Sequence, residues 1–231
     1  MIRTLLFDID GTLIATNEGG KGAMARTLEE EFGVARADVD LSFAGRTDRG
    51  LVAELFGRND LADTADNHER FRVAYSSRLP GELARRGGTV FPGIEDLLPR
   101  LAARSDVRVA AMTGNYAETA MHKLQHFDLD PHIQWVVGGD HDADRNQMAH
   151  RALGDLIARH GEDAGLDVVV IGDTPADVRC GHAIGASVVA VCTGGHTRGE
   201  LQQECPAVIL DDFCDVDAVE QLLTAPQLFV P

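Results

Sequence analysis

The sequence lacks the features that would place it in a specialised class of protein. No apolar run approaches the roughly 20 residues that a membrane-spanning helix needs. The first residues carry no basic stretch of the secretory kind, so we expect no signal peptide. The 4 cysteines form no Cys-x-x-Cys pair, and a chain of 231 residues buries enough core to need no disulfide. We therefore expect reduced thiols in a cytoplasmic protein.

Positive charge is also scarce. The chain has 21 Lys and Arg against 37 Asp and Glu, and its formal net charge is −16. Nucleic acids and anionic membranes both require clustered cations, so we expect neither as a partner. Residues 14–90 hold 11 Lys and Arg against 13 Asp and Glu, a net charge of −2 that leaves −14 elsewhere. This segment either helps to receive an anionic substrate or presents ordinary solvated helix faces.

The hydrophobic pattern divides the chain into two kinds of structure. Residues 14–90 carry apolar residues three and four apart, which predicts helices, and the last of these stripes stops at Pro80-Gly81. From residue 91 onward, short apolar runs alternate with helical stretches, a pattern typical of a parallel sheet covered on both faces. The sequence thus predicts an α/β fold with a Rossmann-like core, residues 1–14 and 91–231, and an inserted helical cap, residues 15–90.

The elements expected in the core follow one another in regular alternation. They are strand 4–7, helix 94–101, strand 107–112, helix 116–126, strand 135–137, helix 145–160, strand 167–171, helix 175–184, strand 187–191, helix 198–203, strand 207–210 and helix 216–223.

Two aspartates stand where the first apolar run stops. Residues 4–7 predict a short buried strand, and Asp8 and Asp10 follow it before Gly11 lets the backbone turn. In open α/β folds, ligands bind at the carboxyl ends of the strands. Two neighbouring carboxylates repel each other unless a cation or a shared proton holds them. The pair therefore predicts a metal site, a nucleophile with its acid partner, or both.

Three further polar motifs fall at or between predicted strand ends. Thr113-Gly114-Asn115 ends one strand, the segment from Gly172 to Asp177 (GDTPAD) ends another, and the segment from Gly139 to Arg145 (GDHDADR) lies between them. In this order, and with Asp8-x-Asp10-Gly11-Thr12, they resemble the haloacid dehalogenase-like hydrolase superfamily, in particular its phosphatases of the phosphoglycolate phosphatase type. The resemblance extends over the whole chain, including the helical insertion and the Phe91-Pro92-Gly93 return from it.

The resemblance implies a magnesium-dependent phosphatase that acts on a small phosphorylated metabolite. Asp8 would attack phosphorus and form an aspartyl-phosphate, and Asp10 would protonate the leaving alcohol and later deprotonate water. The family-like ligands of Mg²⁺ are Asp8, the backbone carbonyl of Asp10 and Asp173, with Asp177 as an outer partner that holds a metal-bound water or orients its neighbours. Phosphoglycolate is the first substrate implied. A phosphomutase of the β-phosphoglucomutase type and a non-catalytic phosphate-binding regulator are the alternatives, and the oligomeric state stays open.

The phosphoryl group would be bound by the motif Thr113-Gly114-Asn115, through a hydroxyl and backbone N–H groups. The alternative is that Thr113 and Asn115 only cap the following helix. The family commonly adds a Lys, but Lys123, the only Lys after residue 21, is expected in solvent in mid-helix. Arg145 is therefore the expected phosphoryl-binding cation, the alternative being a solvated Arg among neighbouring acids.

In the insertion, residues 43–48 (FAGRTD) resemble the substrate loop of a cap domain. Thr47 or Asp48 would cap the helix that follows. Arg46 would reach a substrate carboxylate or a second anionic group, and Thr47 would lie beside it in the substrate site. The alternative is a plain exposed turn.

Overall fold

The centre of the computed structural model is a six-stranded sheet in the order β5-β4-β1-β6-β7-β8, and all five strand pairs are parallel. The structure describes residues 2–225. The strands are β1 (Arg3–Phe7), β4 (Val107–Met112), β5 (Val136–Val137), β6 (Val168–Gly172), β7 (Ser187–Val191) and β8 (Val208–Leu210).

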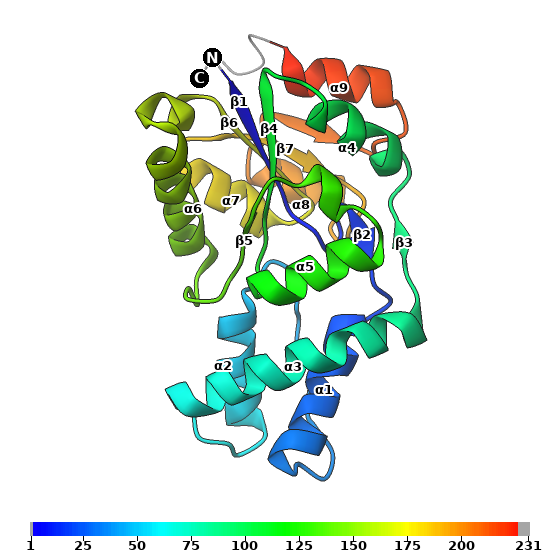
Figure 1. Ribbon diagram of the computed structural model, residues 1–231, viewed down its shortest axis with the longest axis vertical. Helices are drawn as coiled ribbons and strands as arrows, with labels where there is room; N and C mark the ends of the chain where they lie inside the picture. The colour runs from blue at the N-terminus through cyan, green and yellow to red at the C-terminus, as the bar shows by residue number, and fades with distance from the viewer. Residues whose placement is uncertain (1, 226–231) are drawn as a thin grey trace.

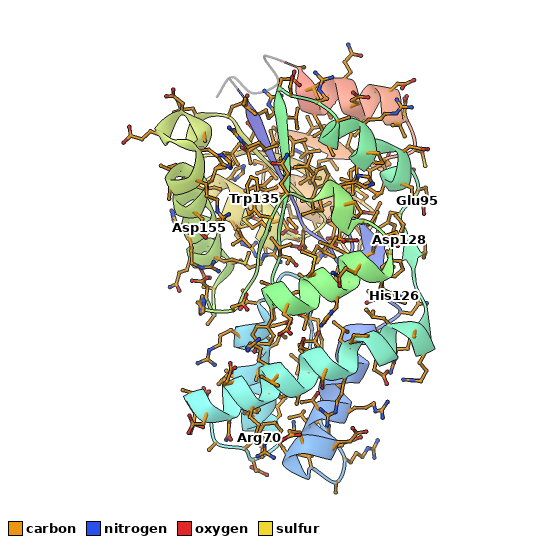
Figure 2. All side chains as sticks on the ribbon, viewed as in Figure 1. Arg70, Glu95, His126, Asp128, Trp135 and Asp155 are labelled. Atoms are coloured by element: carbon orange, nitrogen blue, oxygen red, sulfur yellow. The ribbon has the colours of Figure 1, made fainter. Side chains whose placement is uncertain are left out.

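Helices cover both faces of this sheet (Figure 1). On one face lie α4 (Ile94–Ala102), α5 (Ala117–His126) and α9 (Val216–Thr224), and on the other lie α6 (Arg145–His160), α7 (Pro175–Ala183) and α8 (Arg198–Gln203). Short 3₁₀ turns, η1 (Asp130–His132) and η2 (Glu162–Leu166), join some of them. Side chains fill the space between the layers (Figure 2). Since successive strand residues face opposite sides, Leu5 and Phe7 belong to one apolar core and Leu6 to the other.

A separate group of three helices lies beyond one end of the sheet (Figure 1). It consists of α1 (Gly19–Phe32), α2 (Asp48–Arg58) and α3 (Ala65–Arg86), which share their own apolar cluster. Arg70 lies at the far end of this group, whereas Trp135 belongs to the body that holds the sheet (Figure 2). The chain passes between the two bodies through an antiparallel pair, β2 (Ile14–Ala15) and β3 (Thr89–Val90). The fold is Rossmann-like with an inserted helical cap, while the exact domain boundaries stay a prediction.

The predicted core elements are all present, each boundary within one residue of its expected position. The predicted stop at Pro80 is wrong, because α3 continues through it to Arg86. Proline removes one backbone hydrogen bond from a helix. That loss is offset here by Leu79 and Leu83, which flank the proline and are fully buried in the cap. Within residues 2–225 no helix has both the length and the apolarity to cross a bilayer.

Candidate active site

Three buried carboxylates meet at the carboxyl edge of the sheet. Asp8 directly follows β1, Asp173 directly follows the neighbouring β6, and Asp177 lies in the first turn of α7. One carboxylate oxygen of each lies within 4.8 Å of the other two. The exposed fractions of these residues are 5%, 3% and 0%. Such an arrangement of buried like charges is unfavourable by itself and is typical of a site for a divalent cation.

The pKa values of two of these carboxyl groups are raised by their burial and by their acidic neighbours. Burial raises the pKa of Asp8 from 3.8 to about 7, with Arg145 opposing the shift and Asp177 adding to it. Burial likewise raises the pKa of Asp173 to about 8, and the Asp177 and Asp8 carboxylates add to the increase. The protein alone thus disfavours the ionised forms, and a hard cation among these oxygens would favour them. The carboxylates therefore fit an oxygen-ligated metal such as Mg²⁺.

Close backbone approach fixes the position of Asp173. A Cβ atom on Gly194 would lie 1.7 Å from Asp173 Oδ2, and one on Gly11, whose φ is 85°, would lie 2.4 Å from the same oxygen. Thr12 Oγ1 donates a hydrogen bond to Asp173 Oδ1 at 3.0 Å. Only glycine at positions 11 and 194 leaves room for this carboxylate.

Arg145 lies beside the carboxylates and not in solvent. It is the first residue of α6, which Asp144 caps. Its Nη2 contacts Asp177 Oδ1 and lies 3.6 Å from Asp8 Oδ2. Burial lowers the pKa of Arg145, but the Asp177 and Asp8 carboxylates outweigh it and raise that pKa overall. The alternative of a solvated arginine is therefore wrong.

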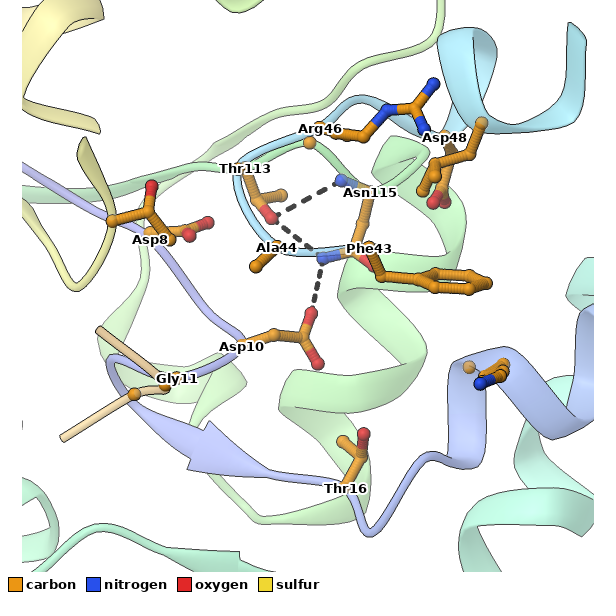
Figure 3. A pocket seen from close by; sticks show the side chains of 18 of the residues that line it. Asp8, Asp10, Gly11, Thr16, Phe43, Ala44, Arg46, Asp48, Thr113 and Asn115 are labelled. Atoms are coloured by element: carbon orange, nitrogen blue, oxygen red, sulfur yellow. Dashed lines mark hydrogen bonds between the residues drawn. The ribbon is translucent and has the colours of Figure 1, made fainter. Parts of the chain in front are cut away.

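Asp10 faces a second polar group on the other side of the site (Figure 3). Asn115 Nδ2 donates to Asp10 Oδ2 at 2.7 Å and to Thr113 Oγ1 at 2.7 Å. Lys123 Nζ donates to Asp10 Oδ2 at 2.6 Å and to Asn115 Oδ1 at 2.7 Å. The loop after β4 and the helix α5 thus hold one oxygen of Asp10 between them.

The prediction that Lys123 lies in solvent is wrong, since it is 3% exposed. Thr119, Ala120 and Leu124 are the other buried residues of α5, and they lie four, three and one position away from Lys123. This spacing places Lys123 on the buried face of the helix. The signal was present in the sequence, and helical periodicity would have found it.

Thr113 and Asn115 do not cap α5, so that alternative is also wrong. The backbone N–H of Tyr116 donates to Asp48 Oδ2 at 2.9 Å, and the next N–H donates to Asp140 Oδ2 at 2.9 Å. The start of the helix is therefore satisfied by acids from elsewhere in the chain. Both residues of the motif line a cavity instead.

This cavity, about 410 Å³ in volume, lies between the carboxyl edge of the sheet and the cap. Arg46 lines it, but its Nη1 forms an ion pair with Glu54 Oε2 at 2.8 Å. Thr47 does not line it and caps α2 by accepting from Gly50 N at 3.2 Å. The structure therefore brings together every predicted site residue around this cavity except Thr47 and Asp177, and Asp177 contacts the lining residue Arg145. These lining residues are Asp8, Asp10, Arg46, Thr113, Gly114, Asn115, Arg145 and Asp173.

Comparison with known proteins agrees with this geometry. The family profile described as haloacid dehalogenase-like hydrolase matches residues 5–191. The chain belongs to the haloacid dehalogenase-like hydrolases. It is 31% identical over 224 residues to a phosphoglycolate phosphatase of Rhodospirillum rubrum, covering 94% of this chain and 90% of that protein. It is 25% identical over 233 residues to a phosphoglycolate phosphatase of Salmonella typhimurium, covering 93% and 91%.

A solved structure shares the fold of this haloacid dehalogenase-like hydrolase. CbbY from Rhodobacter sphaeroides, solved in complex with phosphate, superposes with a TM-score of 0.70 at 20% identity, covering 94% of this chain and 96% of that one. Together with the relatives above, the family assignment makes this chain an enzyme, a hydrolase of the phosphatase type.

Two residues that line the cavity of this haloacid dehalogenase-like hydrolase have contacts other than those expected from the sequence. Lys123 was expected in solvent, and Asp48 was expected in the substrate loop, as a possible cap of the helix that follows. Asp48 contacts the backbone of Tyr116, which lies 68 positions further along the chain. Neither a strand end nor a helical period in the sequence indicates this contact, because it depends on how the cap meets the core.

Proposed function

We propose that this protein hydrolyses a small-molecule phosphate monoester through an aspartyl-phosphate on Asp8, with phosphoglycolate as the first candidate substrate. The observation that carries the proposal is the cluster of Asp8, Asp173 and Asp177 with Asp10 beside it. The names of the relatives support the choice of substrate. A cytoplasmic location, with no nucleic acid or membrane as partner, belongs to the same proposal.

The first step transfers the phosphoryl group to the enzyme. A carboxylate oxygen of Asp8 forms a bond to phosphorus while the bond from phosphorus to the leaving oxygen breaks. Asp10 gives its proton to that leaving oxygen, so the product departs as a neutral alcohol. Asn115 and Lys123 hold Oδ2 of Asp10 and so orient the other oxygen of the group.

The second step returns the enzyme to its starting state. Asp10, now ionised, takes a proton from a water molecule whose oxygen attacks phosphorus. The bond between phosphorus and Asp8 breaks, and inorganic phosphate is released. Splitting one displacement into two in this way is the general advantage of covalent catalysis.

Asp8, Asp173 and the backbone carbonyl of Asp10 would hold Mg²⁺. Asp177 is an outer partner in this proposal, because Arg145 contacts one of its oxygens and the Thr174 N–H and hydroxyl donate to the other. When bound, Mg²⁺ supplies the charge neutralisation that lets a carboxylate approach a phosphate dianion.

Cations and hydrogen-bond donors of the protein would stabilise the remaining negative charge of the phosphoryl group. Arg145 stands 3.6 Å from Asp8 and so lies next to the transferring group. Thr113 would supply a hydroxyl, and Gly114 and Asn115 would supply backbone N–H groups. Lys123 adds a cation beside Asp10.

The test is phosphate release by the wild type and by Asp8→Asn. With Mg²⁺ present, the wild type should hydrolyse phosphoglycolate and 4-nitrophenyl phosphate, and EDTA should stop both reactions. Asp8→Asn should lower the rate on the order of 10³-fold or more, because the amide oxygen is a poor nucleophile. Asp163→Asn, which changes an exposed acid outside the cavity, is the matched control.

Each outcome of this assay decides between named functions. Full activity of Asp8→Asn would reject Asp8 as the nucleophile. Formation of a phosphate isomer without release of phosphate would make the protein a mutase. Binding of phosphate without turnover of any monoester would make it a regulator.

A further inference from the structure

Asp48 joins the cap to the loop that follows β4. It is the first residue of α2 and is 4% exposed. Its backbone N–H donates to the carbonyl oxygen of Gly114 at 2.6 Å, and its Oδ2 accepts from the N–H of Tyr116 at 2.9 Å. Both bonds cross from the cap to the core. They enclose Asn115, the residue that lies between their two partners.

Beside Asp48, the backbone of the cap and that of the core approach each other closely. A Cβ atom on Gly114 would lie 1.9 Å from the carbonyl oxygen of Arg46, and one on Gly139 would lie 2.9 Å from Thr47 Cβ. Thr47 caps α2 and so stabilises the first turn of the helix, in which Asp48 lies. The position of the cap and that of the loop are therefore determined together.

Asn115 passes this restraint on to the reacting groups. Its side chain donates to Asp10 Oδ2 and accepts from Lys123 Nζ. Its orientation depends on the backbone of Gly114 and Tyr116, which are the two groups that Asp48 binds. Hydrogen bonds and the backbone between Gly114 and Tyr116 thus connect the first turn of α2 with Asp10.

We propose that Asp48 is a positioning residue that holds the cap against the loop after β4 and thereby fixes Asp10 for proton transfer to the leaving group. This inference rests on the proposed function, in which Asp10 is the general acid. Closing of the cap and assembly of the acid are then a single event. With the cap displaced, both bonds of Asp48 are absent and Asn115 loses a restraint.

The proposal differs from a purely structural role in its dependence on the leaving group. A nitrophenolate leaves readily without a proton, whereas an alkoxide such as that of glycolate needs one. Misplacing Asp10 therefore slows the alkyl ester more than the aryl ester. A loss of stability alone would lower the amount of active enzyme and reduce both rates by the same factor.

The experiment compares Asp48→Ala with Asp48→Asn on phosphoglycolate and on 4-nitrophenyl phosphate. Asp48→Ala should lower kcat/KM about tenfold for the alkyl ester and less than about threefold for the aryl ester, as expected for one buried hydrogen bond. Asp48→Asn should recover most of this loss, because an amide oxygen accepts the same N–H. Asp66→Ala, an exposed acid in the first turn of α3, is the matched control.

Hydrogen exchange provides a second measurement that does not depend on catalysis. In Asp48→Ala, the amide of Tyr116 should exchange faster than in the wild type, and in Asp66→Ala it should not. Equal losses on the two substrates, or unchanged exchange at Tyr116, would overturn the proposal. If Asp48→Ala does not fold, Asp48→Ser makes the same comparison, because its shorter side chain does not reach Tyr116. A wild type inactive on both esters would reject the proposed function, and exchange would still decide whether Asp48 holds the loop.

Discussion

Two clusters of acids and arginines, one in the cap and one at the sheet edge, have opposite ratios of charge around their buried carboxylates. In the cap, the side chain of Glu82 on α3 is fully buried and is paired with three guanidinium groups. Its hydrogen bond to Arg85 is the largest cause of a pKa that is lowered to about 2, and Arg26 and Arg86 add to it. One carboxylate is thus surrounded by positive charge, and the protein satisfies it completely.

At the sheet edge three carboxylates share a single guanidinium. Asp8, Asp173 and Asp177 are all buried, and Arg145 is the cation among them. The carboxylate of Glu82 is already neutralised by arginines and needs no ligand, and its ion pair with Arg26 joins α3 to α1. An unbalanced one is retained only where a ligand completes it, which is why perturbed carboxylates mark functional sites. The balance of charge around each carboxylate thus distinguishes Glu82, a structural acid, from the functional acids at the sheet edge.

Removing one arginine from each cluster should affect stability and activity to very different extents. Arg145→Met leaves three buried carboxylates without a guanidinium. At pH 8 without Mg²⁺ it should lower the free energy of unfolding by about 3–5 kcal/mol, and it should lower phosphatase activity on the order of 10²–10³-fold. Arg85→Met leaves Glu82 with two guanidinium groups, so we expect a smaller loss of stability and wild-type activity. Urea denaturation and phosphate release measure the two effects, and equal losses in the two variants would contradict the comparison.

The sequence was sufficient to predict the core and most of the site for a physical reason. Asp8, Thr113 and Asp173 each follow a strand directly, and neighbouring parallel strands bring such positions to one edge of a sheet. Features that depend on the position or the packing of the cap could not be predicted in this way. The bond from Asp48 to Tyr116 depends on how the cap meets the core, and the continuation of α3 through Pro80 depends on packing inside the cap.

The two clusters should also respond to pH with opposite signs. Between about pH 4 and pH 8 the native protein binds more protons than the unfolded chain at Asp8 and Asp173, whose pKa values are raised to about 7 and about 8. Without metal, the free energy of unfolding should therefore fall as pH rises through this window. The lowered pKa of Glu82 acts in the other direction, and its contribution should be lost as pH falls from about 4.5 toward 2.

Thermal melting with EDTA or Mg²⁺ at pH 5 and pH 8 measures these slopes. Mg²⁺ should raise Tm more at pH 8 than at pH 5, because its carboxylate ligands must be ionised. Asp173→Asn should flatten the slope between pH 4 and pH 8 and remove the response to Mg²⁺. Glu82→Gln should flatten only the acid side. A response to Mg²⁺ that survives in Asp173→Asn would place the ion elsewhere.

The pairing of charges in the cap should also determine which cation binds the substrate. Two cap cations line the cavity, but Arg46 is paired with Glu54, whereas Lys21 on α1 forms no ion pair within residues 2–225. The unpaired cation is the one available to the carboxylate of phosphoglycolate. Lys21→Met should therefore raise KM for phosphoglycolate about fivefold, as expected for one partly exposed ion pair. KM for 4-nitrophenyl phosphate, which has no carboxylate, should change less than about twofold.

Arg46→Met is the matched variant for this test, since it removes the other cap cation on the same cavity. Because Glu54 already occupies its guanidinium, the rise in KM for phosphoglycolate should be smaller than in Lys21→Met. A larger rise in Arg46→Met would mean that substrate displaces Glu54 from Arg46. Charge balance in the free protein would then identify the metal ligands of the core but not the substrate contacts of the cap. Charge balance would then indicate function only for residues whose ion-pair partners stay in place when the substrate binds.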